Sequence, residues 1–230
     1  MNEPEISVLV PVYDEAGTVD ELLRRVSAAP YRKQVIVVDD GSSDGTREIL
    51  KQWNGRAGVE VHAHDRNRGK GAALRTALAH ATAPYTIVQD ADLEYDPADY
   101  PKLIEPLRRG QARVVYGTRY SGADNVLPWT KFRLGVHLLN AMVRVLYGAR
   151  ITDEATCYKA FETELLQSLN LRCERFEFCP EATAKVLKRG LRIVEVPIRF
   201  RYRTAAEGKK IGWRDGFEAI WTLLKYRFRD

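Results

Sequence analysis

Three acidic residues follow a short apolar segment in the middle of the chain. Residues 85–88 are β-prone, and Asp90, Asp92 and Glu94 come directly after them at alternate positions. Alternate side chains of an extended chain share a face, so these carboxylates can converge, and they repel one another unless a cation neutralises them. Oxygen ligands at a strand end suit Mg²⁺ or Mn²⁺, commonly shared with a substrate phosphate. The alternative is a solvated acidic turn before a helix at Pro97, and an isolated Asp-x-Asp does not exclude it.

Two adjacent acids end a second β-prone segment. Asp39 and Asp40 follow residues 34–38 and precede a glycine. A carboxylate here can accept hydrogen bonds from a nucleobase N–H or a ribose hydroxyl, and the glycine permits close backbone approach. A helix cap explains the following Ser43 and Asp44, but it leaves the adjacent acids unexplained.

A glycine-containing segment, Asn-Arg-Gly-Lys-Gly at 67–71, begins a helix. Helix N-termini favour anions, so Lys70 or Arg68 could reach a diphosphate. The segment is not a dinucleotide-binding fingerprint, because Leu74 stands where a small residue is needed. The four histidines show no ligand spacing, and we assign them no role.

Strand and helix patterns alternate along the chain, and they must position these residues. We expect strands at 6–10, 34–38, 59–63, 85–88, 113–116 and 192–196, with a further short strand within 152–161. We expect helices at about 18–28, 44–53, 70–81, 97–109, 131–147, 180–189 and 212–228. This order predicts an α/β fold with a Rossmann-like, mostly parallel central sheet and helices on both faces. Such sheets bind ligands at the carboxyl ends of their strands, so the acidic clusters should share one edge.

The composition is that of a globular protein with an uneven charge. Of the 230 residues 45% are apolar, which is enough for a core. Residues 199–230 hold nine Lys/Arg and four Asp/Glu, whereas the other 198 residues hold 27 of each sign. The basic character belongs to the tail, so nucleic-acid binding is a poor explanation. We expect a catalytic domain over 1–205 and a basic amphipathic C-terminal extension over 206–230.

Targeting signals are missing from the sequence as given. No run of 18 apolar residues occurs, and the acidic start has no hydrophobic signal region. The three cysteines lack metal-site spacing, which favours reduced thiols. We expect a cytoplasmic protein, either free or peripheral at the cytoplasmic face of a membrane.

Five motifs occur in a fixed order: Val-Pro-Val-Tyr-Asp-Glu at 10–15, Val-Val-Asp-Asp-Gly-Ser-Ser-Asp at 37–44, Asn-Arg-Gly-Lys-Gly at 67–71, Gln-Asp-Ala-Asp-Leu-Glu at 89–94 and Val-Tyr-Gly-Thr-Arg at 115–119. Together they resemble the family 2 glycosyltransferases with the GT-A fold, and most closely the dolichol- or polyprenyl-phosphate mannose synthase branch. The resemblance covers about residues 5–205. Five ordered motifs are far more specific than any one of them.

The resemblance implies a nucleotide-diphospho-sugar donor and a divalent metal, Mg²⁺ or Mn²⁺. The implied donor-binding residues are Pro11, Tyr13, Glu15, Asp39, Asp40, Lys70 and Asp90. Asp90 and Asp92 would hold the metal against the diphosphate, and Glu94 would be a third ligand. The chain departs from the family pattern at Asp14, where Asn is usual, and at Glu94, where Gln is frequent.

The resemblance also implies an acceptor side. Arg119 and Arg133 match positions that bind an acceptor phosphate, and Arg203 with Lys210 matches a phosphate-gripping loop. Asp153 stands where GT-A enzymes place a general base, although a phosphate acceptor is already anionic and needs little deprotonation.

Four functions follow as hypotheses. The first is an inverting transferase that moves a sugar to a polyprenyl phosphate, with Asp92 and Asp153 in the catalytic centre. The second keeps the fold and uses Asp153 as base for a sugar or protein hydroxyl acceptor. The third is a non-catalytic nucleotide-sugar-binding subunit that depends on a membrane-protein partner. The fourth, on fold grounds alone, is a nucleotidyltransferase.

The C-terminal helix carries an apolar stripe with basic flanks. Its members are Trp213, Phe217, Ile220, Trp221, Leu224 and Phe228. A basic, Trp-bearing amphipathic helix suits a membrane surface. The alternatives are packing on the protein's own core or on a second copy in a homodimer.

Overall fold

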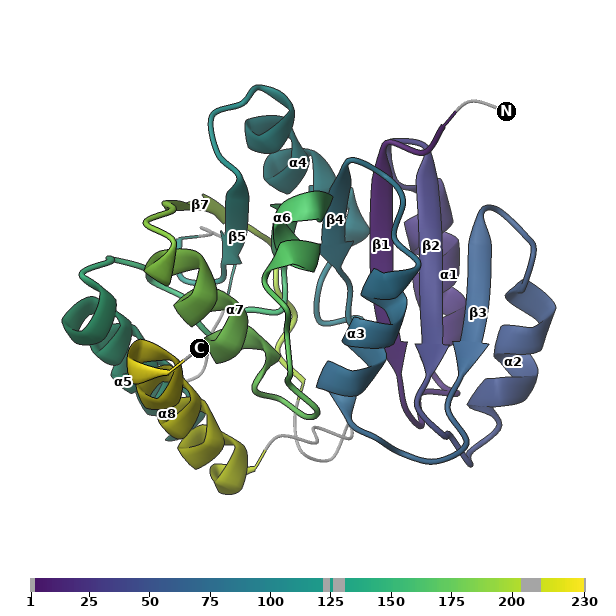
Figure 1. Ribbon diagram of the computed structural model, residues 1–230. Helices are drawn as coiled ribbons and strands as arrows, with labels where there is room; N and C mark the ends of the chain where they lie inside the picture. The colour runs from purple at the N-terminus through teal and green to yellow at the C-terminus, as the bar shows by residue number, and fades with distance from the viewer. Residues whose placement is uncertain (1–2, 122–124, 126–130, 204–211, 230) are drawn as a thin grey trace.

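A seven-stranded sheet forms the centre of the molecule (Figure 1). The computed structural model describes residues 3–121, 125, 131–203 and 212–229. The strands lie in the order β3-β2-β1-β4-β6-β5-β7. Their bounds are β1 Ile6–Val12, β2 Lys33–Asp39, β3 Val59–Ala63, β4 Tyr85–Val88, β5 Val114–Thr118, β6 Lys159–Glu162 and β7 Ile193–Pro197.

The sheet is mostly parallel, as the sequence predicted. β1 pairs in parallel with β2 and β4, β2 with β3, and β5 with β7. β6 is the departure, because it runs antiparallel to both β4 and β5. It enters the sheet from a loop rather than from a crossover helix, and parallel pairing would need such a crossover.

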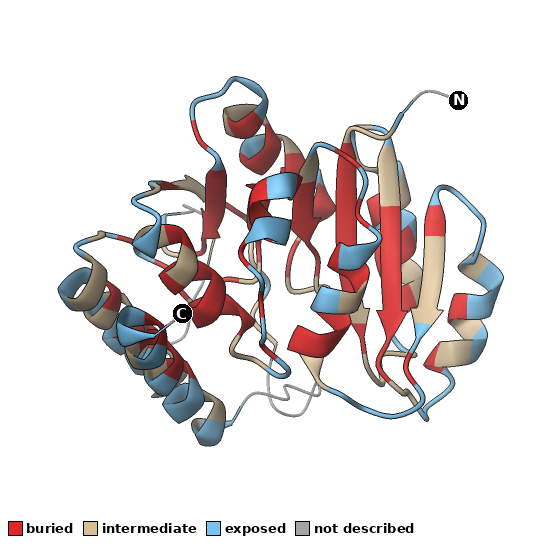
Figure 2. Cartoon of the chain, viewed as in Figure 1, coloured by how far each residue is buried: buried red, intermediate tan, exposed pale blue. Residues whose placement is uncertain are grey.

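Helices cover both faces because successive strand side chains point to opposite sides. Leu9 of β1 belongs to one buried cluster, and its neighbours Val8 and Val10 belong to the other. The first cluster lies under α3 Lys70–Ala79, α5 Lys131–Tyr147, α6 Thr163–Ser168, α7 Phe178–Lys188 and α8 Trp213–Phe228. The second lies under α1 Val19–Ala28, α2 Thr46–Trp53 and α4 Tyr100–Arg108, which follows the 3₁₀ turn η1 Pro97–Asp99. Figure 2 shows the central strands as almost wholly buried.

Most predicted elements are confirmed within a few residues. α6 was not predicted, since its six residues are too short for a clear periodic pattern. α7 begins at Phe178, before the proline that was expected to open it.

The acidic clusters do share one edge of the sheet. Val12 of β1 is in register with Asp39 of β2, and Leu9 is in register with Val88 of β4. The three strands are parallel, so the residues that follow them emerge on the same side. That edge, toward which the arrowheads of β1 and β2 point in Figure 1, is where the site lies.

α8 is packed onto the main body of the protein. Ala219, Leu223 and Tyr226 are buried in the cluster that also contains α5 and α7. Phe217 and Trp221 are about two-thirds exposed. The expected boundary at 205/206 falls outside the described residues. In the described part of the chain, no helix is both long and apolar enough to traverse a bilayer.

Candidate active site

A cavity of about 430 Å³ opens at the carboxyl edge of the sheet. The ends of β1, β2 and β4 and the start of α3 contribute to its wall, together with loops from the second half of the chain. Ten residues predicted from the sequence line it: Pro11, Tyr13, Glu15, Asp40, Lys70, Asp90, Asp92, Glu94, Arg119 and Arg203.

Asp90 forms an ion pair in the cavity wall. Its Oδ1 lies 2.6 Å from Nζ of Lys70, which also donates a hydrogen bond to Sγ of Cys157 at 3.0 Å. Burial lowers the pKa of Lys70, but the nearby Asp90 and Cys157 outweigh burial and hold it well above its usual value. Lys70 is therefore a permanent cation beside the acidic residues, where a diphosphate would need one.

Asp92 lies among like charges. Burial, followed by the charges of Asp90 and Glu94, raises the pKa of Asp92 to about 7. An opposite charge placed beside these carboxylates would lower their repulsion.

The segment 201–203, which follows β7, borders the cavity through Arg203. The backbone N–H of Arg203 donates to Oε1 of Glu94 at 3.0 Å, and that of Arg201 donates to the Glu94 carbonyl at 2.9 Å. Nη1 of Arg203 lies 3.2 Å from both carboxylate oxygens of Glu15 and 4.0 Å from Oδ2 of Asp92. The guanidinium thus connects the β1 loop with the acids after β4.

The three acids of the metal prediction all line the cavity. Asp90, Asp92 and Glu94 do not bring one ligand oxygen each within 4.8 Å of one another in the described structure. Oε1 of Glu94 accepts a hydrogen bond from the backbone N–H of Arg203. Mg²⁺ is usually held by one or two carboxylates plus substrate phosphates, so Asp90 and Asp92 suffice for a metal shared with a diphosphate.

Asp39 and Asp40 shape loops. Asp39 does not line the cavity; it accepts hydrogen bonds from Nε of Arg47 at 2.8 Å and from the Ser42 N–H at 3.0 Å. Asp40 lines the cavity but is only 2% exposed. It accepts from the backbone N–H groups of Arg68 at 2.9 Å and Gly69 at 2.7 Å. Both acids therefore position neighbouring loops, and the structure places only Asp40 where it could meet a base.

Gly69 is required by this packing. Its φ is +95°, and a Cβ there would lie 2.3 Å from the Glu174 carbonyl oxygen. The same close approach satisfies the start of α3, since Gly71 and Ala72 donate their N–H groups to the carbonyls of Arg175 and Glu174. Two N–H groups of this helix N-terminus are thus engaged within the protein, while Gly69 and Lys70 line the cavity. Arg68 is exposed and does not line it.

Arg119 and Asp153 form a buried ion pair. Arg119 donates to Asp153 through Nε at 2.7 Å, Nη2 at 2.6 Å and its backbone N–H at 2.9 Å. Asp153 is fully buried and does not line the cavity, whereas Arg119 does. The prediction that Asp153 acts as a general base is not supported by this arrangement, because both its oxygens are engaged by Arg119.

Two other acceptor predictions are not placed in the cavity. Arg133 does not line it; its guanidinium carbon lies 5.6 Å from the centroid of the Tyr120 ring. Lys210 lies outside the described residues.

Further residues that sequence reasoning did not select also line the cavity, among them Asn67, Tyr95, Cys157, Arg175 and Phe176. Tyr95 comes directly after the acids, and Asn67 lies within a quoted motif, so their positions could have indicated them. Arg175 and Phe176 arrive from the loop before α7, and no local pattern identifies them.

Comparison with known proteins assigns the chain to a family. The family model described as Glycosyl transferase family 2 matches residues 7–169. The chain belongs to this family. It is therefore a glycosyltransferase, and the predicted GT-A fold is confirmed.

Two curated relatives of this glycosyltransferase are similar over most of the chain. The UDP-N-acetylglucosamine–dolichyl-phosphate N-acetylglucosaminyltransferase of Methanococcus voltae is 29% identical and matches over 97% of this chain and 96% of its own length. The undecaprenyl-phosphate 4-deoxy-4-formamido-L-arabinose transferase of Edwardsiella ictaluri is 30% identical over 89% of this chain, which spans 62% of that enzyme.

Among solved structures, glucosyl-3-phosphoglycerate synthase of Mycobacterium tuberculosis with UDP superposes with a TM-score of 0.76. It is 22% identical, and the match covers 99% of this chain and 81% of the other. At this identity the likeness concerns the fold.

Proposed function

We propose that this glycosyltransferase moves a sugar from a nucleotide-diphospho-sugar to a polyprenyl phosphate, with inversion at the anomeric carbon. The donor diphosphate would lie over Asp90, Asp92 and Lys70, with the nucleoside toward Pro11 and Tyr13. The relatives whose names specify dolichyl and undecaprenyl phosphate acceptors support the acceptor class.

The cavity fits a divalent metal together with the diphosphate. Asp90 and Asp92 are the residues that would hold it, and Mg²⁺ and Mn²⁺ both suit such oxygen ligands. When bound, the metal would neutralise charge on the departing nucleoside diphosphate. A solved relative of this fold was crystallised with Mn²⁺ and UDP.

The Arg119–Asp153 pair is the observation that favours a phosphate acceptor. A hydroxyl acceptor needs a base to take its proton, but Asp153 is buried behind Arg119 and accepts three hydrogen bonds from it. A phosphate oxygen is already anionic. Asp153 would then act by holding Arg119 in place, and Arg119 and Arg203 would attract the phosphate.

This chain's residues would mainly bind and orient the reactants. Holding two reactants in line is worth up to about 7–11 kcal/mol of the barrier. In-line attack by the acceptor oxygen on the face opposite the leaving group inverts the anomeric centre.

A specific observation also supports action at a membrane surface. In the described residues, every large apolar side chain that is highly exposed lies on α5 or α8: Leu134, Leu138, Val145, Phe217, Trp221 and Phe228. On each helix the spacing of four and then seven residues puts the three on one side. We call these six residues the α5–α8 apolar face. Arg144, Arg214, Lys225 and Arg227 are exposed on the same helices, a combination that suits anionic lipid.

The test is a comparison of two acceptors that differ in one group. Full-length protein, Mn²⁺ and a panel of UDP- and GDP-sugars are incubated in detergent with undecaprenyl phosphate or with undecaprenol. We expect nucleoside diphosphate release and a glycolipid product with the phosphate only.

Equal transfer to undecaprenol or to a sugar hydroxyl would overturn the phosphate proposal. Release of pyrophosphate would indicate a nucleotidyltransferase, and no turnover with any donor, with or without membranes, would indicate a non-catalytic subunit. Replacing Asp153 separates these cases poorly, because it also breaks a buried ion pair.

A further inference from the structure

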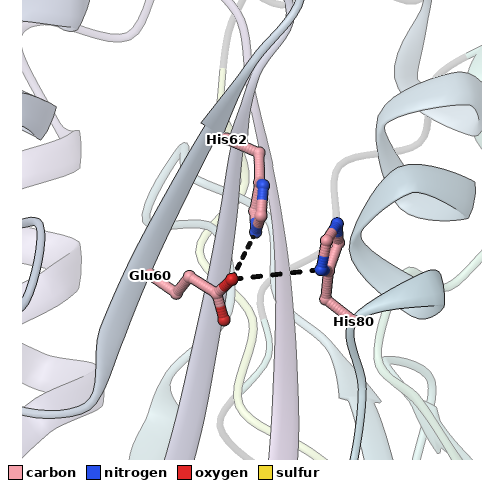
Figure 3. A group of neighbouring side chains, drawn as sticks. All are labelled: Glu60, His62 and His80. Atoms are coloured by element: carbon pink, nitrogen blue, oxygen red, sulfur yellow. Dashed lines mark ion pairs between the residues drawn. The ribbon is translucent and has the colours of Figure 1, made fainter.

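Three side chains with metal-binding atoms meet at the β3 edge of the sheet. Figure 3 shows Glu60, His62 and His80 pointing toward one another. Oε1 of Glu60 lies 2.8 Å from Nε2 of His62 and 3.9 Å from Nδ1 of His80. All three ligand atoms lie within 4.8 Å of one another, and no other group of the described residues meets this criterion.

The three residues come from two elements that are firmly placed. Glu60 and His62 are two positions apart on β3, so they share a face. His80 follows α3, and its carbonyl accepts a hydrogen bond from Nε2 of Gln34 at 2.8 Å. Gln34 also accepts from the Thr82 N–H at 3.0 Å. The turn after α3 is thereby fixed to β2, next to β3.

The contacts within the cluster leave one buried nitrogen without a hydrogen bond. Nε2 of His62 is buried and has no hydrogen-bond partner among the described residues, although it is in contact with Glu60. The contact is close but does not have hydrogen-bond geometry. A buried polar atom without a partner is costly in a folded protein.

The two imidazole rings stack on each other. Their centroids are 3.9 Å apart and their planes differ by 23°. The stack holds the two rings side by side, next to the Glu60 carboxylate.

We propose that Glu60, His62 and His80 bind a divalent first-row transition metal of the Zn²⁺ type. Two imidazole nitrogens and one carboxylate oxygen form a known zinc ligand set, and a water would complete the tetrahedron. Ligands at zinc distances are about 3.4 Å apart in a tetrahedron. The observed separations of 2.8 and 3.9 Å lie on either side of this value, and side-chain rotations would be needed to aim both imidazole nitrogens at one ion.

This site is separate from the donor cavity. α3 begins at Lys70 in the cavity wall and ends at Ala79, a length of about 15 Å. The nitrogen ligands also distinguish it, since Mg²⁺ prefers oxygen alone. A metal here would link the edge strand β3 to the end of α3.

The experiment measures zinc binding to metal-stripped full-length protein by equilibrium dialysis, without nucleotide. The variants are His62→Gln and His80→Gln, and the matched control is His137→Gln, an exposed histidine on α5. We expect each of the first two changes to weaken zinc binding at this site at least tenfold. At a zinc concentration that saturates the wild type, each variant should then bind one equivalent of zinc fewer. The control should bind like the wild type.

Cobalt gives a second readout that does not depend on activity. Co²⁺ in the wild-type protein should show the visible absorption of a four-coordinate ion, and either substitution should remove it. All substituted side chains are partly exposed, so metal-free melting temperatures should match the wild type. Equal zinc binding by all four proteins, or no cobalt band in the wild type, would overturn the proposal. Loss of sugar transfer alone would concern the donor cavity instead.

Discussion

Single residues in the cavity owe their properties to crowded charge. Asp92 is raised in pKa by burial and by two neighbouring acids, while Lys70 stays cationic because Asp90 and Cys157 surround it. Strongly shifted pKa values such as these gather at functional sites. Burial also raises the pKa of Glu154, a fully buried acid.

Replacing Asp92 tests the donor site. We expect Asp92→Ala to lower sugar transfer by roughly 100-fold or more, because charge stabilisation at the departing diphosphate is lost. Removing one of three repelling carboxylates should leave the melting temperature equal or higher. Nucleoside diphosphate release and thermal unfolding measure the two effects, with the exposed Asp65→Ala as control. Unchanged turnover would contradict the role given to Asp92.

Glu154 makes stability depend on pH. Burial is the main cause that raises the pKa of Glu154 from 4.5 to about 7, and its Oε2 has no hydrogen-bond partner among the described residues. The folded state therefore holds a proton that the unfolded state has released between these two values, so stability falls as pH rises from 4.5 to 7.

We expect Glu154→Gln to be more stable than the wild type by roughly 1–3 kcal/mol at pH 8, and to show little gain at pH 4.5. Urea unfolding at several pH values measures this. Glu164→Gln, an exposed change on α6, is the control. A gain that does not vary with pH would show that ionisation of Glu154 is not the cause.

At the scale of elements, α8 has two different sides. Leu223 is fully buried against the cluster that includes α5 and α7, while Trp221 is 66% exposed. Of the sequence alternatives, packing on the protein's own core is therefore present on one side. The other side is left for a surface function.

Truncating each side of α8 should have different effects. Leu223→Ala should destabilise the protein by about 2–5 kcal/mol, because it leaves a cavity in the core. Trp221→Ala should change stability by less than about 0.5 kcal/mol. Urea unfolding of both variants measures the difference. Equal losses would mean that Trp221 is also packed in solution.

At the scale of the whole molecule, the sheet edge and the helical layer have separate tasks. The carboxyl edge gathers the acids and cations that we propose bind the donor, and α5 with α8 presents the α5–α8 apolar face. In Figure 1 the start of α8 lies toward the same end of the molecule to which the strand arrowheads point. A lipid-linked acceptor requires such a combination of a polar cavity and an apolar surface.

Binding to lipid vesicles tests this division. We expect the protein to sediment with anionic vesicles. The double change Trp221→Ser, Phe228→Ser should weaken binding at least tenfold, because it removes apolar area that would be buried in the membrane. Raising the salt concentration should weaken binding further by screening the basic flanks. Gln52→Ser, an exposed change on α2, is the control. Equal sedimentation of all variants would exclude the α5–α8 apolar face as the contact.

The sequence by itself determined the sheet, its acidic edge and the family. Strand periodicity is local, and Asp40, Asp90 and Asp92 lie at strand ends where the parallel order alone brings them together. Only the tertiary structure decided which of these side chains contact one another. Asp153 meets Arg119 across 34 residues, and His80 reaches Glu60 from another element, so no local spacing announced either contact. Long-range packing brings such pairs together, so a local sequence pattern cannot predict them.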